Sequence, residues 1–151
     1  MAPTSCTRLI TLLSVLLPLA CGDPLSPSDV AGTYALQRVA GDTLPAVLYT
    51  NDNVTVRVFA DTLRFTVDHR GALITVRESE PLAGGPSTGP VHWETPFTFR
   101  IVEDRIEVGF ECPINANCVA PPHLVLRRTP TGLRADFALG ARLPLSYERV
   151  S

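Results

Sequence analysis

The chain has 151 residues, and its 13 basic and 15 acidic side chains give a formal net charge of −2 at pH 7. All of the basic residues are arginine and they form no basic patch, which argues against nucleic acid as a partner. The sequence carries no motif for a nucleophilic serine, a zinc-binding helix or a phosphate-binding loop. We therefore expect neither an enzyme nor a bound cofactor or metal.

The first 20 residues have the organisation of an export signal. Arg8 precedes the apolar run Leu9–Ala20, which is shorter than the roughly 20 residues of a membrane-spanning helix. A charged start, a short apolar core and small residues before a cleavage point are typical of a signal peptide. We predict that residues 1–20 are a signal peptide.

The segment Leu17-Pro18-Leu19-Ala20-Cys21 resembles the lipobox of bacterial lipoproteins, although that family prefers Leu at the position of Pro18 and a smaller residue at Leu19. The resemblance implies that Cys21 receives a diacylglycerol, that cleavage occurs just before it and that its new amino group is acylated. Ordinary release, which leaves a soluble protein, is the alternative. It would leave Cys21 as an exposed thiol in an oxidising compartment.

Cys21 and the residues after it indicate where in the cell the protein is anchored. Residues 21–29 would form the lipidated cysteine and a short polar tether. Gly22 follows the cysteine, and by the sorting habit of such lipoproteins this implies the bacterial outer membrane, facing the periplasm or the cell surface. We therefore expect the chain to bind the membrane through its lipid anchor.

Gly32-Thr33-Tyr34 resembles the Gly-x-Trp motif that opens lipocalin-like (calycin) β-barrels, with Tyr in the place of Trp. In that family the aromatic residue packs across the closed end of the barrel, under a basic residue of the last strand. The resemblance implies that Tyr34 and Arg149 form this barrel-closing pair. The alternative is that Tyr34 begins an ordinary edge strand.

Residues 30–151 are predicted to form a single all-β domain. Apolar and polar residues alternate with a period of two in several segments, which is the signal of strands with one buried face. Short turn-like breaks separate the segments, so that successive strands should be antiparallel. Among these breaks, Glu103-Asp104 can close a two-residue hairpin, and Asp68–Gly71 is a short loop with Gly71 where a positive φ is needed. A meander of about eight strands closes into a barrel or forms two stacked sheets, and we favour a closed lipocalin-like barrel over a β-sandwich. The segments are Val54–Val58, Leu63–Val67, Ala72–Val76, Phe97–Ile101, Ile106–Phe110, Leu124–Leu126 and Leu133–Leu139.

Two groups of polar residues could carry chemistry. His92 and Glu94 share one side of an extended segment, where they could bind a metal or act as base and acid, or form a polar strand face with Trp93 buried opposite. Cys112 and Cys118 enclose five residues, and we predict a disulfide between them. A thiol redox site or a zinc site with His123 are the alternatives.

These observations favour a bacterial cell-envelope lipoprotein that serves as a non-enzymatic binding or interaction module. Its partner would be another envelope protein. The alternative is a lipocalin-like carrier of a small apolar ligand, because a barrel of about eight strands either holds one such ligand or is filled by its own side chains. An enzyme with a site around His92, Glu94 and His123 is a third hypothesis.

Overall fold

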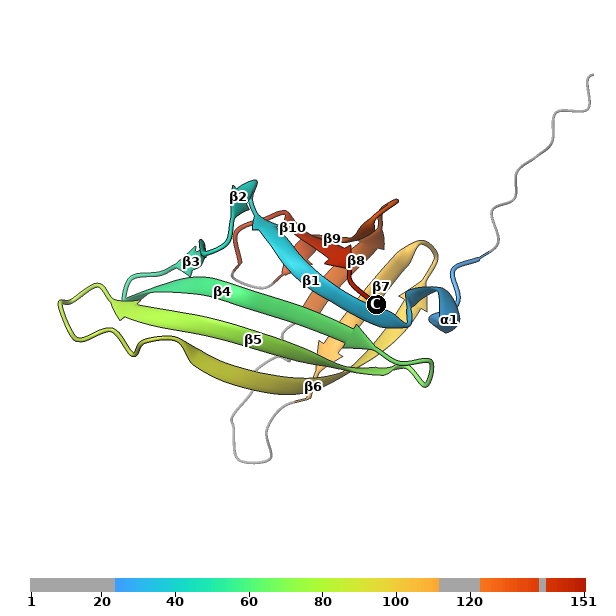
Figure 1. Ribbon diagram of the computed structural model, residues 1–151, viewed down its shortest axis with the longest axis horizontal. Coiled ribbons are helices and arrows are strands. Elements are labelled where there is room, and N and C mark those ends of the chain that lie inside the picture. The colour runs from blue at the N-terminus through green and yellow to red at the C-terminus, as the bar shows by residue number, and fades with distance from the viewer. Residues whose placement is uncertain (1–23, 112–122, 139–140) are drawn as a thin grey trace, which may run out of the picture.

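The computed structural model of the protein describes residues 24–111, 123–138 and 141–151 (Figure 1). One antiparallel sheet of ten strands accounts for most of these residues, and a single short helix precedes it. In chain order the elements are α1 (Pro27–Val30), β1 (Gly32–Val39), β2 (Asp42–Thr43), β3 (Ala46–Thr50), β4 (Val54–Phe65), β5 (Arg70–Pro81), β6 (Val91–Val102), β7 (Arg105–Phe110), β8 (His123–Arg128), β9 (Gly132–Ala138) and β10 (Leu145–Arg149).

The sheet closes on itself because β1 pairs with two strands of the ring. Tyr34 in β1 lies opposite Arg149 in β10 and also takes part in the pairing with β4, opposite Leu63. The ring consists of the eight strands β1 and β4 to β10, while β2 and β3 pair outside it with β1 and β4. The prediction of a closed antiparallel barrel of about eight strands is confirmed, and the β-sandwich alternative is wrong.

The two segments Val54–Val58 and Leu63–Val67, predicted as separate strands, belong largely to the single strand β4. A register irregularity between Val58 and Ala60 explains the discrepancy. Such a bulge adds one residue and so exchanges the inward and outward faces of the strand that follows. The buried residues are even-numbered before the bulge and odd-numbered after it, beginning with Asp61.

The end of the barrel next to α1 is covered by the chain itself. The carboxylate of Asp29 accepts a hydrogen bond of 2.9 Å from the backbone N–H of Ser26 and so holds the start of the helix. Val30 is fully buried in the core at the helix end. The backbone N–H of Thr33 donates to the carbonyl of Ser151 over 2.8 Å, so both ends of the domain meet here (Figure 1).

The hairpin turns agree only partly with expectation. Glu103 and Asp104 close the β6–β7 hairpin as predicted. In the Asp68–Gly71 turn, however, the positive φ belongs to His69, at 63°, and not to Gly71. Gly71 is required for a different reason, because a Cβ there would lie 2.3 Å from the ring of Phe97.

Candidate functional site

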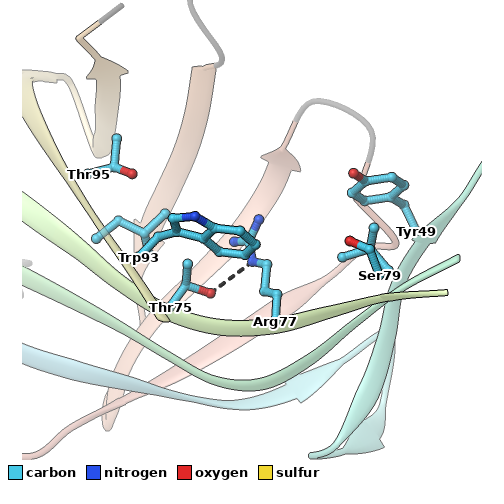
Figure 2. A pocket seen from close by; sticks show the side chains of 8 residues that line it. Tyr49, Thr75, Arg77, Ser79, Trp93 and Thr95 are labelled. Carbon is cyan, nitrogen blue, oxygen red and sulfur yellow. Dashed lines mark hydrogen bonds between the residues drawn. The ribbon is translucent and has the colours of Figure 1, made fainter. Parts of the chain in front are cut away.

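A hollow of about 370 Å³ lies at the end of the barrel opposite α1, between β3, β4, β5 and β6 (Figure 2). We call it the mouth hollow. Its size is near the lower limit of the roughly 300 to 1,000 Å³ that is usual for small-molecule sites. The residues that line it are Tyr49, Val56, Leu73, Thr75, Arg77, Ser79, Trp93 and Thr95.

The strand geometry explains why these residues gather. Four of them alternate along β5, from Leu73 to Ser79, and residues two apart on a strand share one face. The register of β5 and β6 places Trp93 opposite Thr75. The hollow is therefore built on the inward face of the three long strands, where they extend away from α1.

A connected polar network forms one wall of the hollow. The Arg77 Nη2 donates to the Asp61 Oδ2 over 3.1 Å, and its Nε donates to the Thr75 Oγ1 over 2.8 Å. The Thr75 hydroxyl in turn donates to the carbonyl of Ala60 over 3.3 Å. Ala60 belongs to the bulge in β4, so the same irregularity turns Asp61 inward and supplies an acceptor for Thr75.

Asp61 is a buried carboxyl group, and its side chain is only 2% exposed. Burial raises its pKa to about 6, although the guanidinium of Arg77 acts in the opposite direction. The Tyr147 hydroxyl lies 3.5 Å from the second carboxylate oxygen, and burial raises the pKa of this tyrosine well above its usual value. Near neutral pH the charge of Asp61 is compensated by Arg77.

Trp93 is the unusual member of the lining. Sequence reasoning offered a buried Trp93 opposite His92 and Glu94, and this expectation is wrong, because the residue is 45% exposed. It nevertheless faces the same side of the sheet as Thr75, and it lines the hollow together with Arg77 (Figure 2). A large aromatic side chain on the inward face of a barrel thus borders open space.

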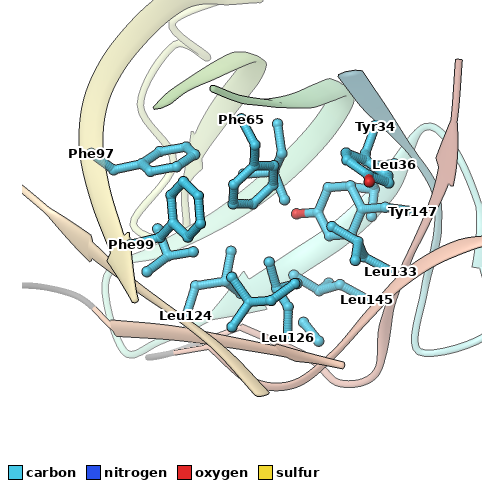
Figure 3. Close-up of a cluster of buried hydrophobic side chains, with 14 of the residues drawn as sticks. Tyr34, Leu36, Phe65, Phe97, Phe99, Leu124, Leu126, Leu133, Leu145 and Tyr147 are labelled. Atoms are coloured by element: carbon cyan, nitrogen blue, oxygen red, sulfur yellow. The ribbon is translucent and has the colours of Figure 1, made fainter. Parts of the chain in front are cut away.

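Beyond the hollow, buried side chains fill the middle of the barrel (Figure 3). Phe65 is the centre of the aromatic part, with ring centroids 5.2 Å from Phe97 and 5.1 Å from Phe99. Phe137 has the same parity as the buried Leu133 and Ala135 but is 47% exposed, because the β8–β9 register shifts by one residue just before it. The middle of the barrel beyond the mouth hollow is therefore filled with packed hydrophobic side chains.

The structure brings together one of the predicted pairs. The guanidinium carbon of Arg149 lies 5.8 Å from the ring centroid of Tyr34, which is 3% exposed. The Arg149 Nη2 donates to the carbonyl of Ala31 over 2.7 Å, and the Tyr34 hydroxyl donates to that of Val30 over 2.9 Å. Burial raises the pKa of Tyr34, and Arg149 partly opposes this effect.

The remaining predicted residues are not joined into a site. His92 and Glu94 are exposed on β6, and His123 lies at the start of β8. Within residues 24–111, 123–138 and 141–151, no three His, Cys, Asp or Glu side chains are placed to hold a metal ion. The same ranges contain no helix long and apolar enough to cross a bilayer.

The predicted lipidation site Cys21 and the predicted disulfide between Cys112 and Cys118 lie outside the described residues. Sequence reasoning missed Asp61, Arg77 and the exposed Trp93. The signal in the sequence was parity, because Arg77 shares that of the inward-facing Leu73 and Thr75, and Asp61 shares that of Leu63 and Phe65.

Comparisons of the chain with protein-family models, with curated proteins and with solved structures found no match. The strand pairing itself therefore defines the class of protein. The chain is a closed eight-stranded antiparallel β-barrel, and this architecture is compatible with a calycin-like fold.

Proposed function

We propose that the protein is a bacterial cell-envelope lipoprotein whose barrel is a non-enzymatic binding module, with the mouth hollow as its binding surface. The observation that carries the binding role is Trp93, which is 45% exposed on the inward face of the barrel. Folding normally covers such a ring, because a large aromatic side chain contributes much of the apolar area that a core buries. Its exposure beside a paired arginine favours a site that a partner completes.

The position of the hollow fits an anchor at Cys21. Residues 22–26 separate Cys21 from α1 and extend over at most about 20 Å, so that an acylated Cys21 would hold the α1 end close to the membrane. The register places Gly71 near α1 and Arg77 six residues further along β5. At about 3.3 Å per residue, the hollow opens roughly 20 Å further from that end.

The second candidate is carriage of a small apolar ligand, and closure of the barrel favours it. The packed aromatic cluster around Phe65 and the charged pair of Asp61 and Arg77 both argue against an apolar ligand at the mouth. A ligand that is partly polar fits the lining better. We therefore rank the binding module above the apolar carrier.

The anchor is tested by the intact mass of the chain purified from membranes of a bacterium that expresses it. We expect an N-terminus at Cys21 that carries a diacylglycerol and an amide-linked acyl chain. The Cys21→Ser variant should lack both modifications. A free thiol at Cys21, or a leader that is still attached, would contradict the lipoprotein assignment.

The binding role is tested in cells with a photo-crosslinking phenylalanine analogue at Tyr49, in the hollow. The matched control carries the analogue at Phe59, which is 36% exposed on the same pair of strands. We expect an adduct with an envelope component from position 49 only. The absence of an adduct, or equal adducts at both positions, would refute the hollow as a binding surface.

A further inference from the structure

The mouth hollow combines a held guanidinium with an exposed aromatic ring. From this combination we infer that its ligand is a small organic carboxylate with a flat ring, its carboxylate on Arg77 and its ring against Trp93. The inference rests on the proposed binding function and names the chemical class of the ligand. It depends on the donors of Arg77, the charges around it and the shape of the hollow.

Arg77 is positioned before any ligand arrives. A guanidinium has five N–H donors. Two of them are engaged, one by Asp61 and one by Thr75, so three have no partner among the described residues. The side chain is 24% exposed, which leaves it accessible from the hollow. A held guanidinium with free donors is suited to a carboxylate, which it can bind through two parallel hydrogen bonds.

The arrangement of charges favours an anion over a cation. Asp61 lies behind Arg77 and is 2% exposed, so an entering ligand meets the guanidinium first. The acidic residues Glu78 and Glu80 alternate with Arg77 on β5 and therefore face the other side of the sheet. Among the described residues, Thr75 lies opposite Asp61 on the neighbouring strand and the Tyr147 hydroxyl lies 3.5 Å from its carboxylate, and both are uncharged near neutral pH.

The shape of the hollow favours a small ligand with a flat ring. Trp93 lines the hollow together with Arg77 (Figure 2), and nearly half of its surface is exposed. Aromatic rings gain stabilisation from offset or edge-to-face contacts, in addition to the area that they bury. A volume of about 370 Å³ suits a compact molecule better than an extended chain.

Trp93 is the only tryptophan of the chain, so intrinsic tryptophan fluorescence reports on the hollow directly. The probes are phenylacetate, its neutral analogue phenylacetamide, and cyclohexylacetate, which keeps the carboxylate but lacks the flat ring. We expect saturable binding of phenylacetate at millimolar concentration. The other two probes should bind roughly tenfold more weakly, because each lacks one of the two contacts.

Two substitutions should move the affinity in opposite directions. Arg77→Gln removes the carboxylate contact and should weaken phenylacetate binding roughly tenfold. Asp61→Asn removes the opposing charge behind Arg77 and should strengthen binding about fivefold at neutral pH. Arg57→Gln, which changes an exposed arginine on the outer face of β4, is the matched control and should leave affinity unchanged.

If Arg77→Gln does not fold, the double variant Asp61→Asn/Arg77→Gln removes both charges together. In that variant phenylacetate and phenylacetamide should bind equally well. The inference would be overturned if the wild-type protein bound phenylacetate and phenylacetamide with equal affinity. It would also be overturned if the two single variants changed the affinity for phenylacetate in the same direction.

The photo-crosslinking result separates the inference from the function on which it rests. Failure of phenylacetate to bind overturns the class of ligand alone when position 49 still gives its adduct. If that adduct is also missing, the proposed binding function falls as well.

Discussion

Each end of the barrel carries an arginine beside an aromatic residue, but the two pairs are built differently. At the α1 end Tyr34 is 3% exposed, and Arg149 approaches its ring. At the mouth, Trp93 is 45% exposed, and Arg77 turns toward the buried Asp61. Tyr34 and Arg149 donate hydrogen bonds to the backbone of residues 30–31, whereas Arg77 donates to the side chains of Asp61 and Thr75.

This difference separates a pair that completes the core from a pair that remains accessible from the mouth hollow. The hydroxyl of Tyr34 and a guanidinium nitrogen of Arg149 each find a backbone acceptor, which covers the end of the barrel. In the lining of the mouth hollow, Arg77 has donors that no described residue uses, and the ring of Trp93 is nearly half exposed. Both pairs combine an arginine with an aromatic residue, so residue type alone does not determine whether a pair is buried or accessible. The neighbouring residues of each pair determine it.

The largest expected effect compares truncation of the two aromatic residues. Tyr34→Ala removes a buried ring and should lower the free energy of unfolding by about 3 to 5 kcal/mol. Trp93→Ala removes a ring that is nearly half exposed and should cost about 1 kcal/mol. Urea unfolding followed by circular dichroism measures both. Equal losses of unfolding free energy in the two variants would show that Trp93 contributes to the core as much as Tyr34 does, and that the two ends of the barrel do not differ in this way.

Removal of the arginine at the mouth should also be costly. Arg77→Ala leaves the carboxylate of Asp61 buried without its partner, and breaking such a pair costs about 3 to 5 kcal/mol of unfolding free energy. The loss should be measured at pH 7.5 and be smaller at pH 4.5, where Asp61 takes up a proton and no charge remains to be compensated. The control Arg57→Ala lies at an exposed position and should change stability by less than about 0.5 kcal/mol.

Asp61 should also give the wild-type protein a recognisable dependence on pH. Its pKa is about 6 in the folded protein, above the ordinary value of 3.8, so the native state holds the proton more tightly than the unfolded state. Its contribution to stability is therefore greatest below pH 4 and is lost as the pH rises to 6. The unfolding free energy, measured relative to Asp61→Asn, should fall by about 3 kcal/mol over this range. A flat difference would show that this carboxyl group has an ordinary pKa.

The barrel could be predicted because its alternating segments are short and the turns between them are local. The sequence from Phe97 to Phe110 shows this well, since two alternating runs flank the two-residue turn at Glu103 and Asp104. Closure could be favoured from the sequence but not established, because it depends on the pairing of β1 with β4 across the intervening β2 and β3. Such a long-range pairing leaves little local signal.

The mouth hollow could not be predicted, and the reason is the bulge in β4. One additional residue between Val58 and Ala60 changes the parity of the strand, so alternation carried forward from Val56 and Val58 places Asp61 on the outer face. The same rule places Trp93 on the inward face correctly. It cannot tell whether another strand covers that ring. Exposure on an inward face is a property of the assembled barrel.

The smallest expected effect concerns the arginine at the closed end. Arg149→Gln loses the hydrogen bond to the carbonyl of Ala31 and the contact with the ring of Tyr34, and should cost about 1 kcal/mol of unfolding free energy. Because Arg149 lies at the far end of the barrel, phenylacetate binding and Trp93 fluorescence should be unchanged. Arg77→Gln should instead weaken binding, so the two variants form a matched pair with separate readouts. Weakened binding in Arg149→Gln would show that the two ends are coupled, and that an arginine beside an aromatic residue does not act locally in this barrel.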